Sequence, residues 1–416
     1  MKRFNNPEEI LHNTALVDSF LTLIKIDTQS DPTTNIWPST PGQLNLLDLL
    51  KGKLQALGCT DIVLDQNGYL FATFPGNVES APVIGLLAHV DTAPDFSGKD
   101  VQPVLHYNYN GSAITLSNGL VIAPEDNPEL KECLGDTIIT ADGRTLLGAD
   151  DKAGVAEILA VLEMLRQNET QPRPTLRIGF TPDEEIGNGP DRFDLPRFNA
   201  HAAYTVDGGF TGEINFETFC ADGAKVIFTG VAVHPGYAKD KMVNALRYLG
   251  AFLDRLPKEE SPERTEKRQG FFHPIKISGN AAEATAELIL RDFEEEALAD
   301  RGRRLQALVT EIGAQEPRLK TETKIEPTYR NMAIKLRERA EVREKLEQAV
   351  QDAGITPVVK PIRGGTDGSG LTAGGLPTPN IFAGGVQVHG PREWVSIRVM
   401  AQAVCTMLNL VQRWAE

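Results

Sequence analysis

The chain has 416 residues, of which 41% are hydrophobic, and its formal net charge is -15 at pH 7. This length allows two domains with substantial cores, and the composition is that of a globular protein. The acidic balance argues against nucleic acid and membranes as partners, because both are bound by concentrated lysine and arginine.

The chain carries four cysteines that lie far apart, with no Cys-x-x-Cys pair. This spacing predicts neither a disulfide framework nor a zinc ribbon. The first residues lack the apolar core of a signal peptide, and no later run approaches the roughly 20 apolar residues of a membrane-spanning helix. We therefore expect a cytoplasmic protein.

The first 80 residues predict two helices followed by a β-hairpin. Apolar residues recur with helical spacing over residues 16–26 and again over 43–57. Asn67-Gly68 separates two β-rich runs, 62–64 and 69–74, and this dipeptide is a strong hairpin signal. The extension before Leu16 and the stretch 95–137 have no clear period, and we predict no structure for them.

The next strand ends in two polar side chains. The run 82–91 is apolar until it presents His89 and Asp91, which leave the strand from the same face because side chains alternate. One could bind a metal while the other fixes its tautomer. If the segment 89–91 is considered alone, the alternative is that His89 has a structural role at the end of the strand.

Carboxylates follow three further strands. They are Asp150 at the start of a predicted helix (155–165), the pair Glu184-Glu185 after a strand at 175–180, and Asp207 after a strand at 203–206. The active sites of open α/β sheets gather at this edge. Structural alternatives remain: Asp150 or Asp151 could cap the helix, and the acidic pair could form a solvated loop.

From about residue 224 the pattern changes to β-α-β-β-α-β, the order of a ferredoxin-like unit. Its predicted strands span 225–233, 271–277, 287–293 and 318–325, and its helices span 242–256 and 297–312. We place this inserted domain at 219–327, between the two parts of a catalytic domain, 1–218 and 328–416. The second part contains a helix at 341–353, a glycine-rich run at 363–370, a strand at 378–382, His389 and a helix at 396–414.

Together these segments supply a set of candidate metal ligands and two neighbouring acids. The ligands are His89, Asp150, Glu185, Asp207 and His389, and the acids are Asp91 and Glu184. Nitrogen and carboxylate donors without cysteine suit a catalytic zinc, manganese or cobalt site. Two cations about 3.5–4 Å apart can both activate water and polarise a carbonyl, which leaves Glu184 free to act as a general base.

Seven segments resemble the tripeptide aminopeptidase (peptidase T) group of the co-catalytic zinc exopeptidases and deacylases. They are 89–92 (HVDT), 148–154 (GADDKAG), 182–187 (PDEEIG), 206–209 (VDGG), 233–236 (VHPG), 363–368 (RGGTDG) and 389–390 (HG). The matches run in order through nearly the whole chain. The resemblance implies an α/β zinc-exopeptidase catalytic domain, with a mixed sheet and flanking helices, and an inserted ferredoxin-like domain that acts as a lid.

The resemblance also implies a role for individual residues. One zinc ion would bind His89, Asp150 and Asp207, and the other would bind Asp150, Glu185 and His389. Asp91 would stand behind His89, and Glu184 would be the base. His234 would stabilise the oxyanion, within one subunit or across a homodimer, and Arg291 and Arg363 would face a substrate carboxylate. The alternative for the two arginines is an ordinary salt-bridge role.

The function that follows is a metallo-aminopeptidase with two Zn²⁺ per subunit, or Co²⁺ or Mn²⁺ in their place, that releases the N-terminal residue of short peptides, above all tripeptides. A dipeptidase, carboxypeptidase or N-acyl-amino-acid deacylase of the same family is the alternative. A non-catalytic binder, whose loop 364–370 would cradle an anion, is disfavoured because all seven ligands and acids are present.

Overall fold

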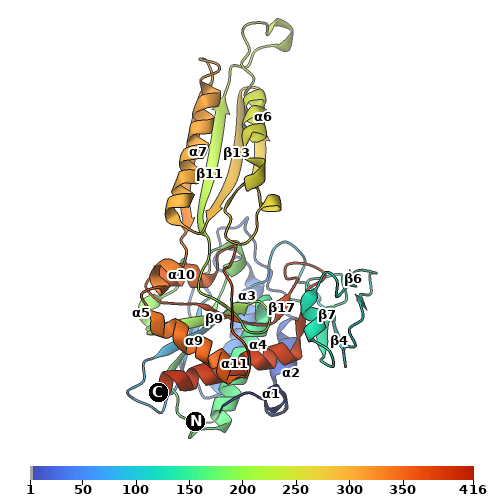
Figure 1. The fold of residues 1–416 in the computed structure, drawn as a ribbon, viewed down its shortest axis with the longest axis vertical. Coiled ribbons are helices and arrows are strands. Elements are labelled where there is room, and N and C mark those ends of the chain that lie inside the picture. Colours follow the sequence, from blue (N-terminus) through green and yellow to red (C-terminus); the bar gives the residue numbers. More distant parts are fainter. Residues whose placement is uncertain (1–2) are drawn as a thin grey trace. The chain divides into compact units, whose positions relative to one another are not determined.

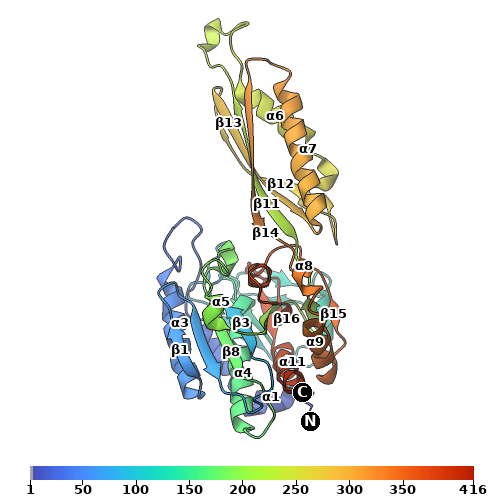
Figure 2. The same cartoon turned by 90° about the vertical axis from the view of Figure 1, so that its left-hand side faces the viewer.

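The computed structural model describes residues 3–416, which form two units (Figures 1 and 2). The larger unit comprises the chain up to Phe216 together with Lys335–Lys360 and Thr366–Glu416, and the smaller comprises Glu217–Ile334 and Pro361–Gly365. The predicted insert, 219–327, therefore lies inside the smaller unit, which also includes residues at both of its ends. The roles of the two units as catalytic domain and lid stay predictions.

An eight-stranded mixed sheet forms the centre of the larger unit. In sheet order its strands are β1 (Thr60–Leu64), β2 (Leu70–Phe74), β8 (Leu176–Thr181), β3 (Ile84–His89), β9 (Ala202–Gly208), β16 (Asn380–Phe382), β10 (Glu213–Asn215) and β15 (Val358–Val359). The central neighbours β8, β3, β9 and β16 are parallel, whereas β1, β2 and β8 pair antiparallel. The predicted α/β fold with a mixed sheet is confirmed.

Helices flank this sheet. The principal one is α4 (Ala149–Gln167), which packs on β3 and β9 and is covered in turn by α2 (Leu16–Leu23) and α11 (Ile397–Ala415). The short helix α5 (Leu195–Phe198) packs close to the strands because Gly85 has no side chain: a Cβ there would lie 2.6 Å from Cε1 of Phe198. The remaining helices of this unit include α3 (Pro41–Ala56), α9 (Ala340–Asp352) and α10 (Asp367–Ala373). Within residues 3–416, no helix has both the length and the apolar character needed to cross a membrane.

The N-terminal extension, for which the sequence predicted no structure, belongs to the core. Its helix α1 (Pro7–Asn13) packs against α11, and Phe4 is buried. The backbone N–H of Phe4 donates to Oδ1 of Asn409 (3.0 Å), and Nδ2 of Asn409 donates to the carbonyl of Phe4 (2.7 Å). These two hydrogen bonds join the two ends of the described chain.

The stretch 95–137, also without a prediction, contributes to a second, antiparallel sheet. In order this sheet contains β17 (Gly385–Val386), β18 (Trp394–Ser396), β7 (Ile138–Ala141) and β4 (Pro103–His106). Beside it lie the hairpin β5 (Ile114–Thr115) and β6 (Val121–Ile122), packed around the fully buried Trp394. The sheet anchors both ends of the loop 387–393, which carries His389.

The smaller unit has the predicted β-α-β-β-α-β order. Its antiparallel sheet runs β12 (Phe271–Gly279), β13 (Glu283–Asp292), β11 (Cys220–Thr229) and β14 (Lys320–Tyr329), and α6 (Ala245–Arg255) and α7 (Glu295–Gly313) pack on it, as the yellow and orange elements of Figure 2 show. The strand predicted at 225–233 ends early, because Val231 leaves the sheet and pairs with Val243.

Candidate active site

The polar strand ends of the larger unit meet at one edge of its sheet. Strands β8, β3 and β9 are parallel neighbours, and His89 lies opposite Thr181 in their register. His89 is the last residue of β3, Asp207 lies near the end of β9, and Glu184 begins a short 3₁₀ turn just after β8. The carboxyl ends of parallel strands therefore place these side chains together, as the sequence predicted.

Asp150 lies between the two histidines. Its Oδ1 is 2.9 Å from Nε2 of His89, and its Oδ2 is 3.3 Å from Nε2 of His389. One carboxylate thus presents a separate oxygen to each imidazole. Asp207 completes the side of His89, with its Oδ1 3.7 Å from Nε2 of that ring.

Glu185 completes the side of His389. Its Oε2 lies 2.9 Å from Nε2 of His389, and its side chain is only 5% exposed. The other oxygen, Oε1, is buried and has no hydrogen-bond partner. A buried carboxylate oxygen without a partner is costly unless a cation or an ordered water satisfies it.

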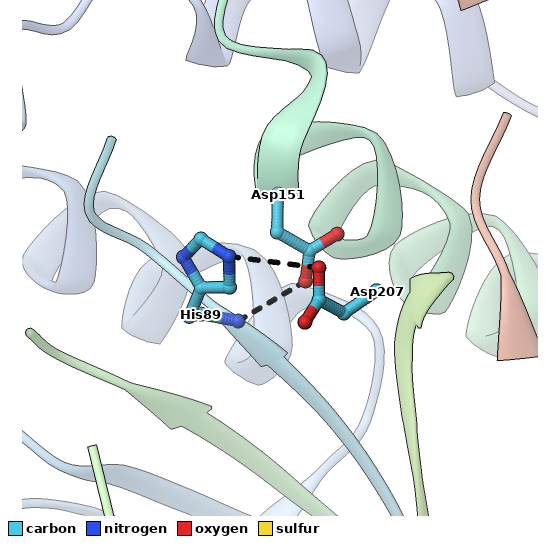
Figure 3. A group of neighbouring side chains, drawn as sticks. All are labelled: His89, Asp151 and Asp207. Atoms are coloured by element: carbon cyan, nitrogen blue, oxygen red, sulfur yellow. Dashed lines mark hydrogen bonds and ion pairs between the residues drawn. The ribbon is translucent and has the colours of Figure 1, made fainter. Parts of the chain in front are cut away.

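Asp151 also lies beside His89 (Figure 3). Two sets of side chains place their potential ligand atoms within 4.8 Å of one another: His89, Asp151 and Asp207 form one set, and His89, Asp150 and Glu185 form the other. The oxygens of Asp151, however, accept hydrogen bonds from the backbone N–H groups of His89 and Gly154, both at 3.2 Å. Asp151 therefore fixes the end of β3 to the start of α4, and Asp150 remains the better candidate ligand.

Asp91 joins the histidine to the acidic turn. Its Oδ1 lies 3.3 Å from Nδ1 of His89 and accepts the N–H of Glu184 at 3.0 Å, while its Oδ2 accepts the N–H of Glu185 at 3.2 Å. Asp91 is completely buried. Nδ1 of His89 also lies 3.1 Å from the backbone carbonyl oxygen of Asp91. The carboxylate of Asp91 thus lies against the imidazole and also holds the backbone of the turn, which the sequence did not indicate.

Burial and mutual interactions shift the pKa values of the cluster's carboxylates and of His389. Burial and the charge of Asp150 raise the pKa of Glu185 to about 8, and burial raises the pKa of Asp207 to about 6. Hydrogen bonds to Asp150 and Glu185 raise the pKa of His389 to about 11. Glu185 and Asp207 thus resist ionisation, whereas hydrogen bonds to His389 and His89 outweigh burial and lower the pKa of Asp150.

The donor set fits divalent cations. The potential ligand atoms are imidazole nitrogens and carboxylate oxygens without sulfur, which is the composition of catalytic zinc sites. A bound cation would satisfy the partnerless oxygen of Glu185 and would lower the raised pKa values of Glu185 and Asp207. We therefore regard the cluster around Asp150 as a fit for the metal that the sequence implied.

A second anchor of the acidic turn was missed by the sequence analysis. Asp183 is fully buried at φ 57°, and its carboxylate accepts hydrogen bonds from the backbone N–H of Ser39 (2.7 Å), from Oγ of Ser39 (2.5 Å) and from Nε2 of Gln43 (2.7 Å). The only available signal was its position next to Glu184, because Ser39 lies in an irregular proline-rich loop. These contacts tie the residue before Glu184 to the loop that precedes α3 and to the first turn of α3.

The three predicted substrate residues all belong to the smaller unit. His234 is exposed, and its Nδ1 accepts the N–H of Gly236 at 3.2 Å. Arg291 stacks over the ring of Tyr329, with its Cζ 5.2 Å from the centroid. Arg363 donates to the backbone carbonyls of Lys267 (2.7 Å) and Gln269 (2.9 Å). Arg363 thus has a structural role inside this unit, and contact of any of the three with substrate stays a proposal.

Comparison with known proteins gives one family. The model of peptidase family M20/M25/M40 matches residues 140–413. Peptidase T of Lysinibacillus sphaericus is 47% identical over 398 residues, which cover 95% of this chain and 97% of the relative. The solved structures of aminopeptidase PepT from Bacillus cereus and of a tripeptidase from Staphylococcus aureus each have a TM-score of 0.75, at 20% and 21% identity, and cover 99% of this chain and 99% of their own. At these identities the two structures show a shared fold.

Proposed function

The chain belongs to peptidase family M20/M25/M40, and from this premise we propose that it is a zinc-dependent aminopeptidase that removes the N-terminal residue from short peptides, above all tripeptides. The names of its relatives, peptidase T, aminopeptidase and tripeptidase, support this substrate class. The observation that carries the proposal is Asp150, whose two oxygens face two histidines on either side. Glu184 lies in the same turn as Glu185.

The proposed metal site holds two Zn²⁺ per chain, with Co²⁺ or Mn²⁺ as ions that the same donors accept. His89 and Asp207 would bind one ion, Glu185 and His389 would bind the other, and Asp150 would be shared. Bound there, the cations would supply Lewis-acid polarisation of the scissile carbonyl and a lowered pKa for water.

The chain's own residues provide proton transfer and alignment. Glu184 takes the proton of the attacking water and passes it to the nitrogen of the leaving amine, the task of a general base that then acts as an acid. Asp91 accepts the backbone N–H groups of both Glu184 and Glu185. The same carboxylate that orients His89 therefore sets the position of the base relative to its neighbouring ligand.

The proposal requires that the free N-terminus of the peptide is recognised. An ammonium is costly to desolvate unless carboxylates meet it, and the acidic cluster supplies them. Acetylating the N-terminus of a good tripeptide should therefore lower kcat/KM by about 10²-fold or more, the loss expected when one partner of a buried charge pair is removed. Steady-state hydrolysis of free and N-acetylated di-, tri- and tetrapeptides by zinc-loaded protein measures this.

C-terminal amidation of the same tripeptide is the matched control. Amidation removes the negative charge of the C-terminus, which Arg291 or Arg363 would meet. It should lower kcat/KM less than acetylation does, because an aminopeptidase recognises its substrate chiefly through the free amine. If the acetylated peptide is cleaved as well as the free one, the aminopeptidase proposal is wrong, and a deacylase or carboxypeptidase of the same family takes its place.

His234 is proposed to stabilise the oxyanion that forms on the scissile carbonyl. Replacing it by alanine should lower kcat by about 10²–10³-fold, the loss seen when one oxyanion donor is removed. Metal content should not change, since His234 lies in the smaller unit and its Nδ1 accepts the N–H of Gly236. His12→Ala, at another exposed histidine, is the control and should leave kcat unchanged.

Loss of metal together with activity in His234→Ala would instead give His234 a structural role. If the residue serves the neighbouring subunit of a homodimer, mixing His234→Ala with Glu184→Gln protein should restore part of the activity. Absence of any recovery would favour action within one subunit.

A further inference from the structure

We propose that Glu393 is a positioning residue of the metal site, which fixes the segment that carries Asp150 and ties it to the loop that carries His389. The inference rests on the proposed two-metal function. It goes beyond that function because Glu393 supplies no ligand atom and acts through the backbone. Its juxtaposition with Asp150 joins two parts of the chain that are 243 residues apart.

The carboxylate of Glu393 accepts three backbone hydrogen bonds at the start of α4. Its Oε2 accepts the N–H of Leu147 (2.7 Å) and of Gly148 (2.8 Å), and its Oε1 accepts the N–H of Asp150 (3.1 Å). The first amides of a helix have no partners within the helix. Here Asp150 has non-helical angles (φ -82°, ψ 106°) and Gly148 is left-handed (φ 80°), so the external carboxylate defines the path of this segment.

The backbone of Glu393 is itself held firmly. Its N–H donates to the carbonyl of Gly390 at 3.2 Å, and the next residue, Trp394, is fully buried as the first residue of β18. β18 pairs with β7, and Nε1 of Trp394 donates to Oδ1 of Asn127 at 3.3 Å. His389 lies four residues earlier in the same loop. One anchored loop therefore delivers an imidazole to the cluster and a carboxylate to the backbone of the opposing ligand.

A carboxylate suits this position because both of its oxygens are used. Glu393 is 1% exposed, and three backbone N–H groups satisfy its two oxygens. An amide or hydroxyl side chain offers only one acceptor oxygen. The buried ammonium group of Lys152 interacts electrostatically with Glu393 and partly balances its charge. Glu393 therefore serves the metals by the position that it gives to Asp150.

Glu393→Gln tests this inference, with Asp136→Asn as the matched control. Asp136 is a second buried carboxylate of the same unit, which accepts the N–H of Thr137 at 2.7 Å and the hydroxyl of Ser396, away from the cluster. The dissociation constant for Zn²⁺ is measured by competition with a chelator, and the ligand geometry by the absorption spectrum of the Co²⁺-loaded protein. The melting temperature of each metal-free protein reports stability separately.

We expect Glu393→Gln to weaken Zn²⁺ binding by about 10–100-fold, the usual loss when a partner of a metal ligand is changed. The Co²⁺ spectrum should change, and kcat should fall more than KM rises. Glu393→Asp, which keeps the charge but shortens the reach, should weaken binding less, and it decides the matter if Glu393→Gln does not fold. Asp136→Asn should lower the melting temperature with Zn²⁺ affinity unchanged.

Wild-type Zn²⁺ affinity and Co²⁺ spectra in the Glu393 variants would overturn the inference, as would an equal loss of affinity in Asp136→Asn. These outcomes leave the proposed function intact provided that the wild-type chain binds two metals. A wild-type chain that binds none contradicts the proposed function itself, so the two failures are distinguishable.

Discussion

Replacing Glu184 by glutamine should lower turnover by about 10²–10⁴-fold while two metal ions remain bound, because glutamine keeps the size of the side chain but cannot accept a proton. In the proposed site Glu184 is the base and supplies no ligand atom, so its replacement should leave the metal content unchanged. Its backbone position is held by Asp91 at 3.0 Å, independently of the side chain that is changed. Steady-state kinetics and the metal content of the same preparation measure the two expectations.

Two further substitutions serve as comparisons for Glu184→Gln. Glu185→Gln changes the adjacent carboxylate, a proposed ligand 2.9 Å from His389, and should lose metal as well as turnover. Glu344→Gln changes an exposed residue of α9 and should have the activity of the wild type. Near-native turnover in Glu184→Gln would remove this residue from the mechanism, and loss of metal would make it a ligand.

The sequence predicted the part of the fold that is built from local patterns. Apolar runs that end in a polar residue located β3 and β9 closely, and Asn67-Gly68 located the hairpin of β1 and β2. Since parallel strands end at the same edge, the strand ends also predicted which side chains would meet. The smaller unit was predicted for the same reason, because each of its elements is long and regularly patterned.

The second sheet of the larger unit could not be predicted in this way. Its strands are two to four residues long, and β18 pairs with β7 across more than 250 positions of sequence. Strands that short carry no period, and nothing local indicates a partner so distant. The N-terminal helix α1 was missed for a related reason: it is stabilised by packing on α11, at the other end of the chain.

The candidate site was predicted at the level of side chains and missed at the level of the backbone. Neighbouring acids such as Asp150 and Asp151 cannot be separated by sequence spacing, and only their contacts distinguish a residue facing two imidazoles from one bonded to backbone N–H groups. Asp183 and Glu393 were missed because their partners are backbone N–H groups or an irregular loop. Every residue except proline has a backbone N–H, so a sequence motif gives no sign of which one will be bound.

Removing the metal ions should abolish activity and lower the melting temperature. Without cations, Asp150, Glu185 and Asp207 face one another in a buried cluster, and the pKa values of Glu185 and Asp207 rise to about 8 and about 6 as a result of burial and of the charge of Asp150. Cations that bind only the folded chain stabilise it, by about 2.7 kcal/mol when their free concentration is 100 times the dissociation constant. Dialysis against a chelator, followed by activity and thermal unfolding measurements, tests both effects.

Adding metal ions back to the metal-free protein then shows which ions the site accepts and how many. Zn²⁺ or Co²⁺ should recover activity as two equivalents per chain are added, because each proposed set of ligands contains an imidazole. Ca²⁺ and Mg²⁺ should not, since both prefer sites made of oxygen atoms alone. Asp150→Asn should bind both Zn²⁺ ions more weakly, whereas loss of one ion only would mean that Asp150 is not shared. Full activity in the metal-free protein would contradict the proposed mechanism, because Glu184 alone cannot polarise the carbonyl of a peptide bond.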